Sequence, residues 1–293
     1  MSDERKAVRP AMFCRETGET VTCELCPHNC AIPKNAAGFC GVRENVGGRL
    51  FAAGYGLVSA IALDPIEKKP LYRFHPGKHV LSVGGFGCNL NCPFCQNAAI
   101  SRDYDSSRAE CLSPERLAKL AAQTVPDGNI GVAYTYNEPL IGYEFLYDSA
   151  KLVREAGLCN VVVTNGYISR EPLEKLLPLI DAMNIDLKGF SDGLYKKLGG
   201  GLEDVKETIR LAYKHCHVEI TTLIIPGEND SEEEIALLAD WIASLDPEIP
   251  LHLSRFFPRR QYSGRQPTPR GTVHRLQETA KKHLNHVFTG NMD

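Results

Sequence analysis

Three closely spaced cysteines, Cys88, Cys92 and Cys95, carry the clearest chemistry in this chain of 293 residues. Their spacing, C-x3-C-x2-C, places three thiolates on one short loop, where they could bind three irons of a [4Fe–4S] cube. The fourth iron then has no protein ligand, whereas ferredoxin clusters and structural zinc sites are closed by four ligands. An open iron position indicates a site that binds another molecule during turnover.

A chelating amino acid is the natural ligand for the open iron, and the methionyl end of S-adenosylmethionine is one. An electron passed into its sulfonium breaks a carbon–sulfur bond and releases a 5′-deoxyadenosyl radical, so the cofactor supplies the reactivity and the protein positions it. A chance cysteine cluster or a zinc knuckle is the alternative interpretation. We disfavour it because the triplet directly follows an expected strand, where a site is expected in this kind of fold.

Four further cysteines form a second set near the N-terminus: Cys23, Cys26, Cys30 and Cys40. Four thiolates at these short spacings could close a tetrahedral zinc site or hold a second iron–sulfur cluster. Ligand softness does not discriminate, because both metals accept four cysteines. Cys14 and His28 are alternative ligands. We expect a metal site of structural or electron-relay type here rather than free thiols.

Composition restricts the partners and the compartment. A formal net charge of −3 gives no electrostatic footprint for nucleic acid or an anionic membrane surface. The charged stretch 1–6 has no apolar run behind it, so no secretory signal is expected, and eighteen apolar residues nowhere run together, so no membrane span is expected. The expected location is the cytoplasm, where thiols stay reduced and eleven cysteines indicate metal or redox chemistry rather than disulfides.

From residue 79 onward, strand-like and helix-like segments alternate. The expected strands are 79–85, 130–136, 160–164, 183–187, 218–225 and 251–256. Such alternation predicts parallel βαβ units, and six repeats are fewer than the eight of a closed barrel. We expect an α/β fold, a partial open (β/α)6 barrel, with its site at the carboxyl ends of the strands.

The expected domain organisation has three parts. Residues 1–50 contain five cysteines and little periodicity, so we interpret them as a small Cys-rich metal-binding module. Residues 51–78 form a connecting segment, and residues 79–293 form the partial barrel.

The cysteine triplet, with Phe94 just before its last cysteine, resembles that of the radical S-adenosylmethionine (radical SAM) superfamily. Within it, the chain is similar to relatives of pyruvate formate-lyase activating enzyme, and most similar to the AmmeMemoRadiSam branch. The resemblance covers nearly the whole chain. Its most specific motifs lie at residues 23–30, 38–45, 64–72, 95–97, 135–139, 164–166, 186–188 and 254–258. The resemblance implies a barrel of the radical SAM type, holding a [4Fe–4S] cluster and S-adenosylmethionine.

The resemblance also implies roles for individual residues. Phe94 would lie near the adenine. Residues 136–139 occupy the place of the family's GGE motif, which holds the amino group of the cofactor; Glu138 keeps the carboxylate, but Tyr136 and Asn137 replace the glycines. A carboxylate accepts a charge-assisted hydrogen bond from an ammonium. A strand-end helix cap is the competing interpretation of Glu138.

Three more residues are matched by motif. Asp186 and Lys188 correspond to the Asp-Leu-Lys motif of the activating enzymes, where they lie near the cofactor carboxylate and ribose, and Thr164 matches a residue beside them. In those activating enzymes an aspartate precedes the threonine and helps to hold a monovalent cation. Val163 stands there in this chain, which puts the cation site in doubt.

These features predict a radical enzyme that abstracts hydrogen from a substrate. The resemblance to activating enzymes suggests a glycine on a partner protein, with a flavodoxin- or ferredoxin-like reductant, whereas the AmmeMemoRadiSam branch fixes no substrate. The rivals are a non-enzymatic iron–sulfur electron carrier and a zinc-binding interaction module. The carrier leaves Glu138, Asp186 and Lys188 at successive strand ends without a reason, and the zinc module leaves the open three-cysteine site unexplained.

Overall fold

The computed structural model describes residues 9–104 and 109–292, and its body is one eight-stranded sheet in the order β15-β14-β13-β12-β11-β10-β8-β7. All neighbouring strands run parallel except β7, which pairs antiparallel with β8. The strands are β7 (Ala60–Pro65), β8 (His79–Gly84), β10 (Asn129–Tyr134), β11 (Cys159–Thr164), β12 (Ala182–Asp186), β13 (His217–Ile224), β14 (Leu251–Arg255) and β15 (Val287–Gly290). Parallel order requires a crossover between successive strands, and helices supply most of them.

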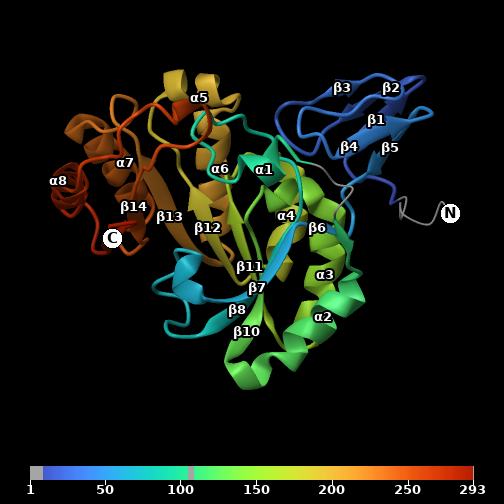
Figure 1. The fold of residues 1–293 in the computed structure, drawn as a ribbon, viewed down its shortest axis with the longest axis horizontal. Helices are drawn as coiled ribbons and strands as arrows, with labels where there is room; N and C mark the ends of the chain where they lie inside the picture. The colour runs from blue at the N-terminus through green and yellow to red at the C-terminus, as the bar shows by residue number, and fades with distance from the viewer. Residues whose placement is uncertain (1–8, 105–108, 293) are drawn as a thin grey trace.

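Helices follow the strands and cover the sheet, with α2, α3 and α4 on one side of the molecule and α7 and α8 beside the last strands (Figure 1). They are α1 (Ala98–Ser101), α2 (Pro114–Gln123), α3 (Tyr143–Glu155), α4 (Arg170–Leu176), α5 (Asp192–Leu198), α6 (Leu202–Tyr213), α7 (Glu232–Leu245) and α8 (Arg270–Ala280). Short 3-10 turns are η1 (Ile66–Lys68), η3 (Val125–Asp127), η4 (Pro139–Gly142), η5 (Leu177–Leu179) and η6 (Arg260–Tyr262). Serine caps begin α2 and α7: Ser113 and Ser231 accept hydrogen bonds from backbone N–H groups three residues on. Among the described residues there is no helix with the length and apolarity of a membrane span.

Alternate strand residues face opposite sides of the sheet. Leu81, Val162 and Met183 belong to the main core under the helices. Their neighbours Val80, Val161 and Ala182 face the inner side, where they pack with Ile66, Leu71 and Ala133. This is the period-2 alternation of a strand buried on both faces. The segment after β7 therefore closes the inner side of the sheet near the amino ends of the strands.

The predicted α/β fold is confirmed, with two additional strands in the sheet. β15 is a seventh parallel strand of four residues, of which only Val287 is buried, so it carries no strand pattern in the sequence. β7 comes from the predicted connector 51–78, where its residues are mostly half-buried at a sheet edge. Edge strands lack the continuous apolar run that marks the central ones.

The N-terminal part forms small antiparallel sheets at one end of the molecule, beyond α3 and α4 (Figure 1). They comprise β1 (Cys14–Thr17), β2 (Thr20–Cys23) and β3 (Ala31–Ile32), and the hairpin of β4 (Arg43–Val46) and β5 (Arg49–Ala52). A separate two-stranded pair joins β6 (Leu57–Val58) to β9 (Glu110–Cys111), the segment before α2. The predicted boundary at residue 50 falls inside β5, because the hairpin runs on to residue 52. Residues 1–8 of the predicted module and of the expected signal-free N-terminus lie outside the described residues.

Candidate cluster and cofactor site

The three-cysteine loop leaves the carboxyl end of β8. Cys88, Cys92 and Cys95 are all free thiols, and the Leu90 N–H donates to Cys88 Sγ at 3.3 Å. Burial, together with nearby negative groups, raises the pKa of Cys88 to about 12 and that of Cys92 to about 11. The neighbouring cysteine sulfurs contribute to the raised pKa of both Cys88 and Cys92, and cysteines bind a metal group as thiolates. A set of three soft sulfur donors on one loop fits an iron–sulfur cluster.

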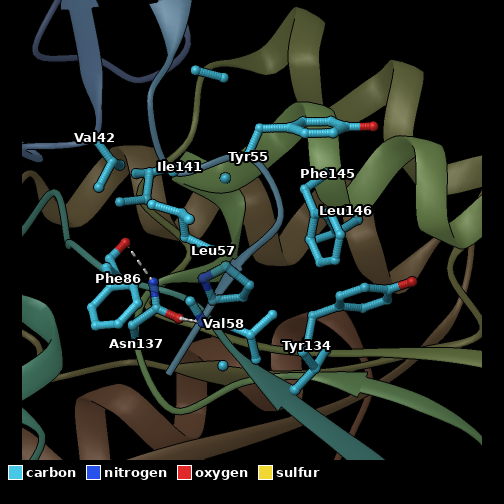
Figure 2. Close-up of a pocket in the computed structure, with 17 residues that line it drawn as sticks. Val42, Tyr55, Leu57, Val58, Phe86, Tyr134, Asn137, Ile141, Phe145 and Leu146 are labelled. Carbon is cyan, nitrogen blue, oxygen red and sulfur yellow. Dashed lines mark hydrogen bonds between the residues drawn. The ribbon is translucent and has the colours of Figure 1, made fainter. Parts of the chain in front are cut away.

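Asn137, which follows β10, clamps the first part of this loop. Its Oδ1 accepts from the Gly85 N–H at 2.9 Å, and its Nδ2 donates to the Phe86 carbonyl at 2.9 Å (Figure 2). Gly85 and Asn137 also line a mainly apolar pocket between the segment 52–58 and the start of α3. Asn137 was predicted to contact the cofactor; the contacts described here are those of a residue that holds the cysteine loop.

A second asparagine fixes the other end of the loop. Asn97, two residues after Cys95, donates from Nδ2 to the carbonyl of Tyr136 at 2.7 Å. Tyr136 has φ 71°, a left-handed conformation that is uncommon for a residue with a side chain. Both ends of the cysteine loop are therefore tied to the chain that follows β10. Neither Asn97 nor Tyr136 has a predicted role from the sequence, although both lie in its specific motifs, 95–97 and 135–139.

Glu138 directly follows Asn137 and is buried, with 2% of its surface exposed. Its carboxylate accepts from the Leu140 N–H at 3.0 Å, the Thr164 hydroxyl at 2.7 Å and the Asn165 N–H at 2.7 Å. Burial raises its pKa to about 7, against the lowering effect of these hydrogen bonds. Glu138 thus caps η4, as the competing interpretation predicted, and it also joins the ends of β10 and β11.

Two asparagines missed by the sequence analysis connect Glu138 with the cysteines. Asn165 Nδ2 lies 3.6 Å from Cys88 Sγ and 2.9 Å from Asn89 Oδ1. The backbone of the same Asn165 is held by Glu138. The signal available in the sequence was the position of Asn165 between Thr164 and Gly166, directly after an expected strand.

Asp186 and Lys188 meet at the end of β12. Lys188 Nζ lies 2.5 Å from Asp186 Oδ2, and both side chains are only partly exposed. Burial by itself would lower the pKa of Lys188, but Asp186 and the Cys92 sulfur raise it overall. Lys188 also lowers the pKa of Cys92, opposing the effect of burial, so this ion pair faces the cysteine loop.

Phe94 extends the loop toward the far strands. It is buried against Leu194, Leu198, Ile225 and Phe256, which come from α5 and from the segments after β13 and β14. The cysteine loop therefore spans the carboxyl edge of the sheet from β8 to β14. All the predicted site residues of the barrel lie along this edge.

The second cysteine set lines a separate hollow. Cys23, Cys26, Cys30 and Cys40 surround it together with His28, Phe39 and Asn89. All four thiols are free. Within residues 9–104 and 109–292, no three His, Cys, Asp or Glu side chains are arranged as the ligands of a single metal ion.

Comparison with known proteins identifies the family. The sequence model described as "Radical SAM superfamily" matches residues 82–239. An uncharacterized protein of Methanocaldococcus jannaschii is 42% identical over 291 residues, which cover 97% of this chain and 86% of that protein. The pyruvate formate-lyase-activating enzyme of Clostridium pasteurianum is 30% identical over 167 residues, 54% of this chain and 67% of that enzyme.

Solved structures share the fold at low sequence identity. A radical SAM methyltransferase from Sphaerobacter thermophilus matches with a TM-score of 0.57 and 15% identity, over 74% of this chain and 67% of that one. Streptococcus suis SuiB bound to precursor peptide SuiA matches with a TM-score of 0.56 and 16% identity, over 69% of this chain and 46% of that one. The superfamily match extends over more than half of the chain, from β8 to α7. The chain belongs to the radical SAM superfamily.

Proposed function

We propose that this protein holds a [4Fe–4S] cluster on Cys88, Cys92 and Cys95 and uses it to cleave S-adenosylmethionine reductively. The family implies the cluster and the cofactor; the assignment of residues is ours. The observation that carries it is the position of Asn165, whose side chain reaches Cys88 while its backbone is held by Glu138. One hydrogen-bonded unit thus links a cluster ligand with a cofactor-binding carboxylate.

Each residue around the loop would bind a different part of S-adenosylmethionine or hold a binding residue in place. The Glu138 carboxylate has lone pairs beyond the three bonds it already accepts and would take one from the cofactor ammonium. Thr164 holds that carboxylate in place. Lys188 would pair with the cofactor carboxylate and Asp186 would accept from the ribose hydroxyls. Phe94 would offer a face to the adenine, and Asn137 fixes the loop that carries the cysteines.

When bound, the cluster supplies the single electron that breaks a carbon–sulfur bond of the cofactor. The substrate of the radical would be a glycine of a partner protein or peptide. Support comes from relatives named as activating enzymes, including a putative glycyl-radical enzyme activating enzyme of Haemophilus influenzae that is 30% identical over 131 residues. The reductant would be a protein of the flavodoxin or ferredoxin class.

The test is anaerobic reconstitution with iron and sulfide, followed by reduction in the presence of S-adenosylmethionine. We expect 5′-deoxyadenosine from the unmodified protein and from Cys111→Ser, whose thiol is exposed and lies outside both cysteine sets. We expect none from Cys92→Ser. Absence of 5′-deoxyadenosine from the reduced, cluster-loaded protein would leave only an electron carrier.

The substrate class is tested by supplying peptides with deuterated glycine. Deuterium in 5′-deoxyadenosine would identify the glycine as the hydrogen donor. If 5′-deoxyadenosine forms but carries no deuterium with any of these glycine peptides, the glycyl-radical proposal is wrong. The proposed cleavage of S-adenosylmethionine would still stand.

A further inference from the structure

We propose that Cys23, Cys26, Cys30 and Cys40 hold a second iron–sulfur cluster, which passes single electrons to the Cys88 site across the contact between Asn89 and Asn165. The direction of transfer rests on the proposed function of the Cys88 site. The four-thiol site itself follows from the N-terminal residues, and its position beside the Cys88 loop favours an iron–sulfur cluster over zinc.

Backbone turns gather the four thiols. The Cys23 N–H donates to the Cys30 carbonyl at 2.9 Å, which closes a loop that carries Cys26. Within this loop the Asn29 N–H donates to the Cys26 carbonyl at 3.1 Å. A second tight turn presents Cys40, since the Gly41 N–H donates to the Gly38 carbonyl at 2.9 Å. Two turns thus place the four cysteines around one hollow. An iron–sulfur cluster takes one sulfur on each of its irons, so the four need not converge on a single ion.

The wall of this hollow that faces the barrel is part of the cysteine loop. Asn89, the neighbour of Cys88, lines the hollow, and its carbonyl is 2.8 Å from His28 Nε2. Its side-chain oxygen accepts from Asn165 Nδ2 at 2.9 Å, and that amide is also 3.6 Å from Cys88 Sγ. One residue and one hydrogen bond therefore separate the two sets of thiols.

Independent contacts hold the two sites in this relation. Arg102, which ends α1, donates to the carbonyl of Phe39 at 2.8 Å and, through Nη2, to that of Leu90 at 2.8 Å. The Ser169 N–H donates to the Leu25 carbonyl at 3.1 Å. The module thus docks through the face that carries its cysteines: a side chain holds the Phe39 carbonyl and a backbone N–H holds the Leu25 carbonyl, and both residues line the hollow.

This placement favours an iron–sulfur cluster over zinc. A structural zinc ion is redox-inert and stabilises a small fold wherever it lies, so nothing requires it to adjoin a second thiol set. A redox cluster gains its function from that proximity. In each cycle a reduced donor of the flavodoxin or ferredoxin class loses one electron to the N-terminal cluster. That cluster is reoxidised by giving one electron to the cluster at Cys88, and no bond or proton is exchanged.

The first experiment counts metal in the full-length protein after anaerobic reconstitution. We expect about eight irons per chain in the unmodified protein and in Cys111→Ser, and about four in Cys26→Ser/Cys30→Ser. In the reduced unmodified protein, the electron paramagnetic resonance signals of two adjacent half-integer spins should broaden each other. The broadening should vanish in Cys26→Ser/Cys30→Ser. About four irons with one zinc in the unmodified protein would overturn the proposal, whether or not the variant folds.

The second experiment tests the relay. Reduced flavodoxin is mixed rapidly with the protein, and reduction of the Cys88 cluster is followed by electron paramagnetic resonance. The signal of this cluster is recognised because it changes when S-adenosylmethionine is added. We expect the fast phase to be lost in Cys26→Ser/Cys30→Ser, while dithionite still drives formation of 5′-deoxyadenosine. If the unmodified protein holds two clusters but Cys26→Ser/Cys30→Ser keeps the same fast phase, the relay is wrong. If instead dithionite yields no 5′-deoxyadenosine even from the unmodified protein, the proposed function of the Cys88 site fails separately.

Discussion

A buried lysine organises the inner side of the sheet. Lys69 is 3% exposed, and its Nζ lies 2.8 Å from Asp64 Oδ2 and 4.6 Å from the centre of the Tyr136 ring. The Tyr136 hydroxyl donates to the same Asp64 oxygen at 2.7 Å. The Tyr136 carbonyl in turn accepts a hydrogen bond from Asn97, so the motif at 64–72 supports the end of the cysteine loop through Tyr136. The Asp64 carboxylate and the Lys69 ammonium compensate each other's charge in a region where neither charge would be stable alone.

Replacing Lys69 by methionine should therefore destabilise the protein by roughly 1.5–3 kcal/mol, because Asp64 keeps its charge and loses its buried cation, retaining the Tyr136 hydroxyl and the exposed Lys68. Lys68→Met is the matched control: Lys68 pairs with the same Asp64 at 3.4 Å but is 67% exposed, and its loss should cost less than about 1 kcal/mol. The measurement is denaturant unfolding of the metal-free protein. Equal costs for the two variants would contradict this account.

Glu219 is a second buried carboxylate on the inner side. It accepts hydrogen bonds from His252 Nε2 at 2.6 Å, His217 Nε2 at 2.9 Å and the backbone N–H groups of Tyr72 and Arg73. Burial alone would raise its pKa, but these donors lower it to about 2. The charged carboxylate thus joins β13 and β14 to the segment that follows η1.

A lowered carboxyl pKa makes the folded state sensitive to acid. The unfolded chain takes up the proton near pH 4.5 and the folded chain only near pH 2, so the stability from Glu219 is complete above pH 4.5 and is lost as the pH falls toward 2. Glu219→Gln should unfold more easily at pH 7 and show a flatter loss of stability between pH 4.5 and 2. Denaturant midpoints measured across this range test the prediction; parallel curves for the two proteins would refute it.

Among the elements, the cysteine loop depends on Gly87. This glycine has φ 81°, and a Cβ there would lie 2.5 Å from the Cys40 carbonyl oxygen and 2.9 Å from Val42 Cγ1. The loop that carries Cys88 thus touches the backbone of the N-terminal module. A rigid backbone atom cannot move aside as the end of a flexible side chain would.

Gly87→Ala should consequently displace the loop and lower iron incorporation at Cys88. Gly157→Ala is the control, because Gly157 has φ 72° and no atom within 4 Å of its added Cβ. Both variants carry the strain of a left-handed alanine, roughly 1 kcal/mol, but only the first meets a steric barrier. Iron analysis and formation of 5′-deoxyadenosine distinguish them; equal iron content would show that the contact with Cys40 is unimportant.

At the scale of the whole molecule, one buried ion pair joins the module to the barrel. Arg43 of β4 lies 3.1 Å from Glu144 of α3, and both side chains are almost completely buried. Arg43 also donates to the Met12 carbonyl at 2.5 Å, and Glu144 accepts from the Met12 N–H at 2.6 Å. Three segments far apart in the sequence meet at this point.

Arg43→Met should free the module, at a cost of about 3–5 kcal/mol, because Glu144 would remain buried without its partner. Arg15→Met is the control, since Arg15 and Glu24 form a pair of 2.8 Å in the same module with Arg15 71% exposed. Limited proteolysis of the folded protein should cut residues 9–52 faster in Arg43→Met than in Arg15→Met. Equal cleavage rates in the two variants would mean that docking does not depend on the buried pair.

The sequence by itself determined the features that are encoded locally. Alternating apolar runs predicted six of the parallel strands, and the polar motifs after them predicted one composite edge, because parallel strands end on the same side. The spacing of Cys88, Cys92 and Cys95 needed no fold, since all three lie on one loop. The strands β15 and β7 were not predicted because they carry no apolar pattern: β15 has four residues with one buried, and none of the six residues of β7 is buried.

Only the tertiary structure decided which distant residues meet. Asn165 next to Cys88, Asn89 in the wall of the second thiol hollow, Tyr136 on Lys69 and Arg43 against Glu144 all join segments separated by dozens of residues. No local pattern encodes such pairs, because each partner alone resembles an ordinary polar residue at a strand end or on a helix. They become necessary only when the fold removes water from between them, and a buried polar group then has to find its partner.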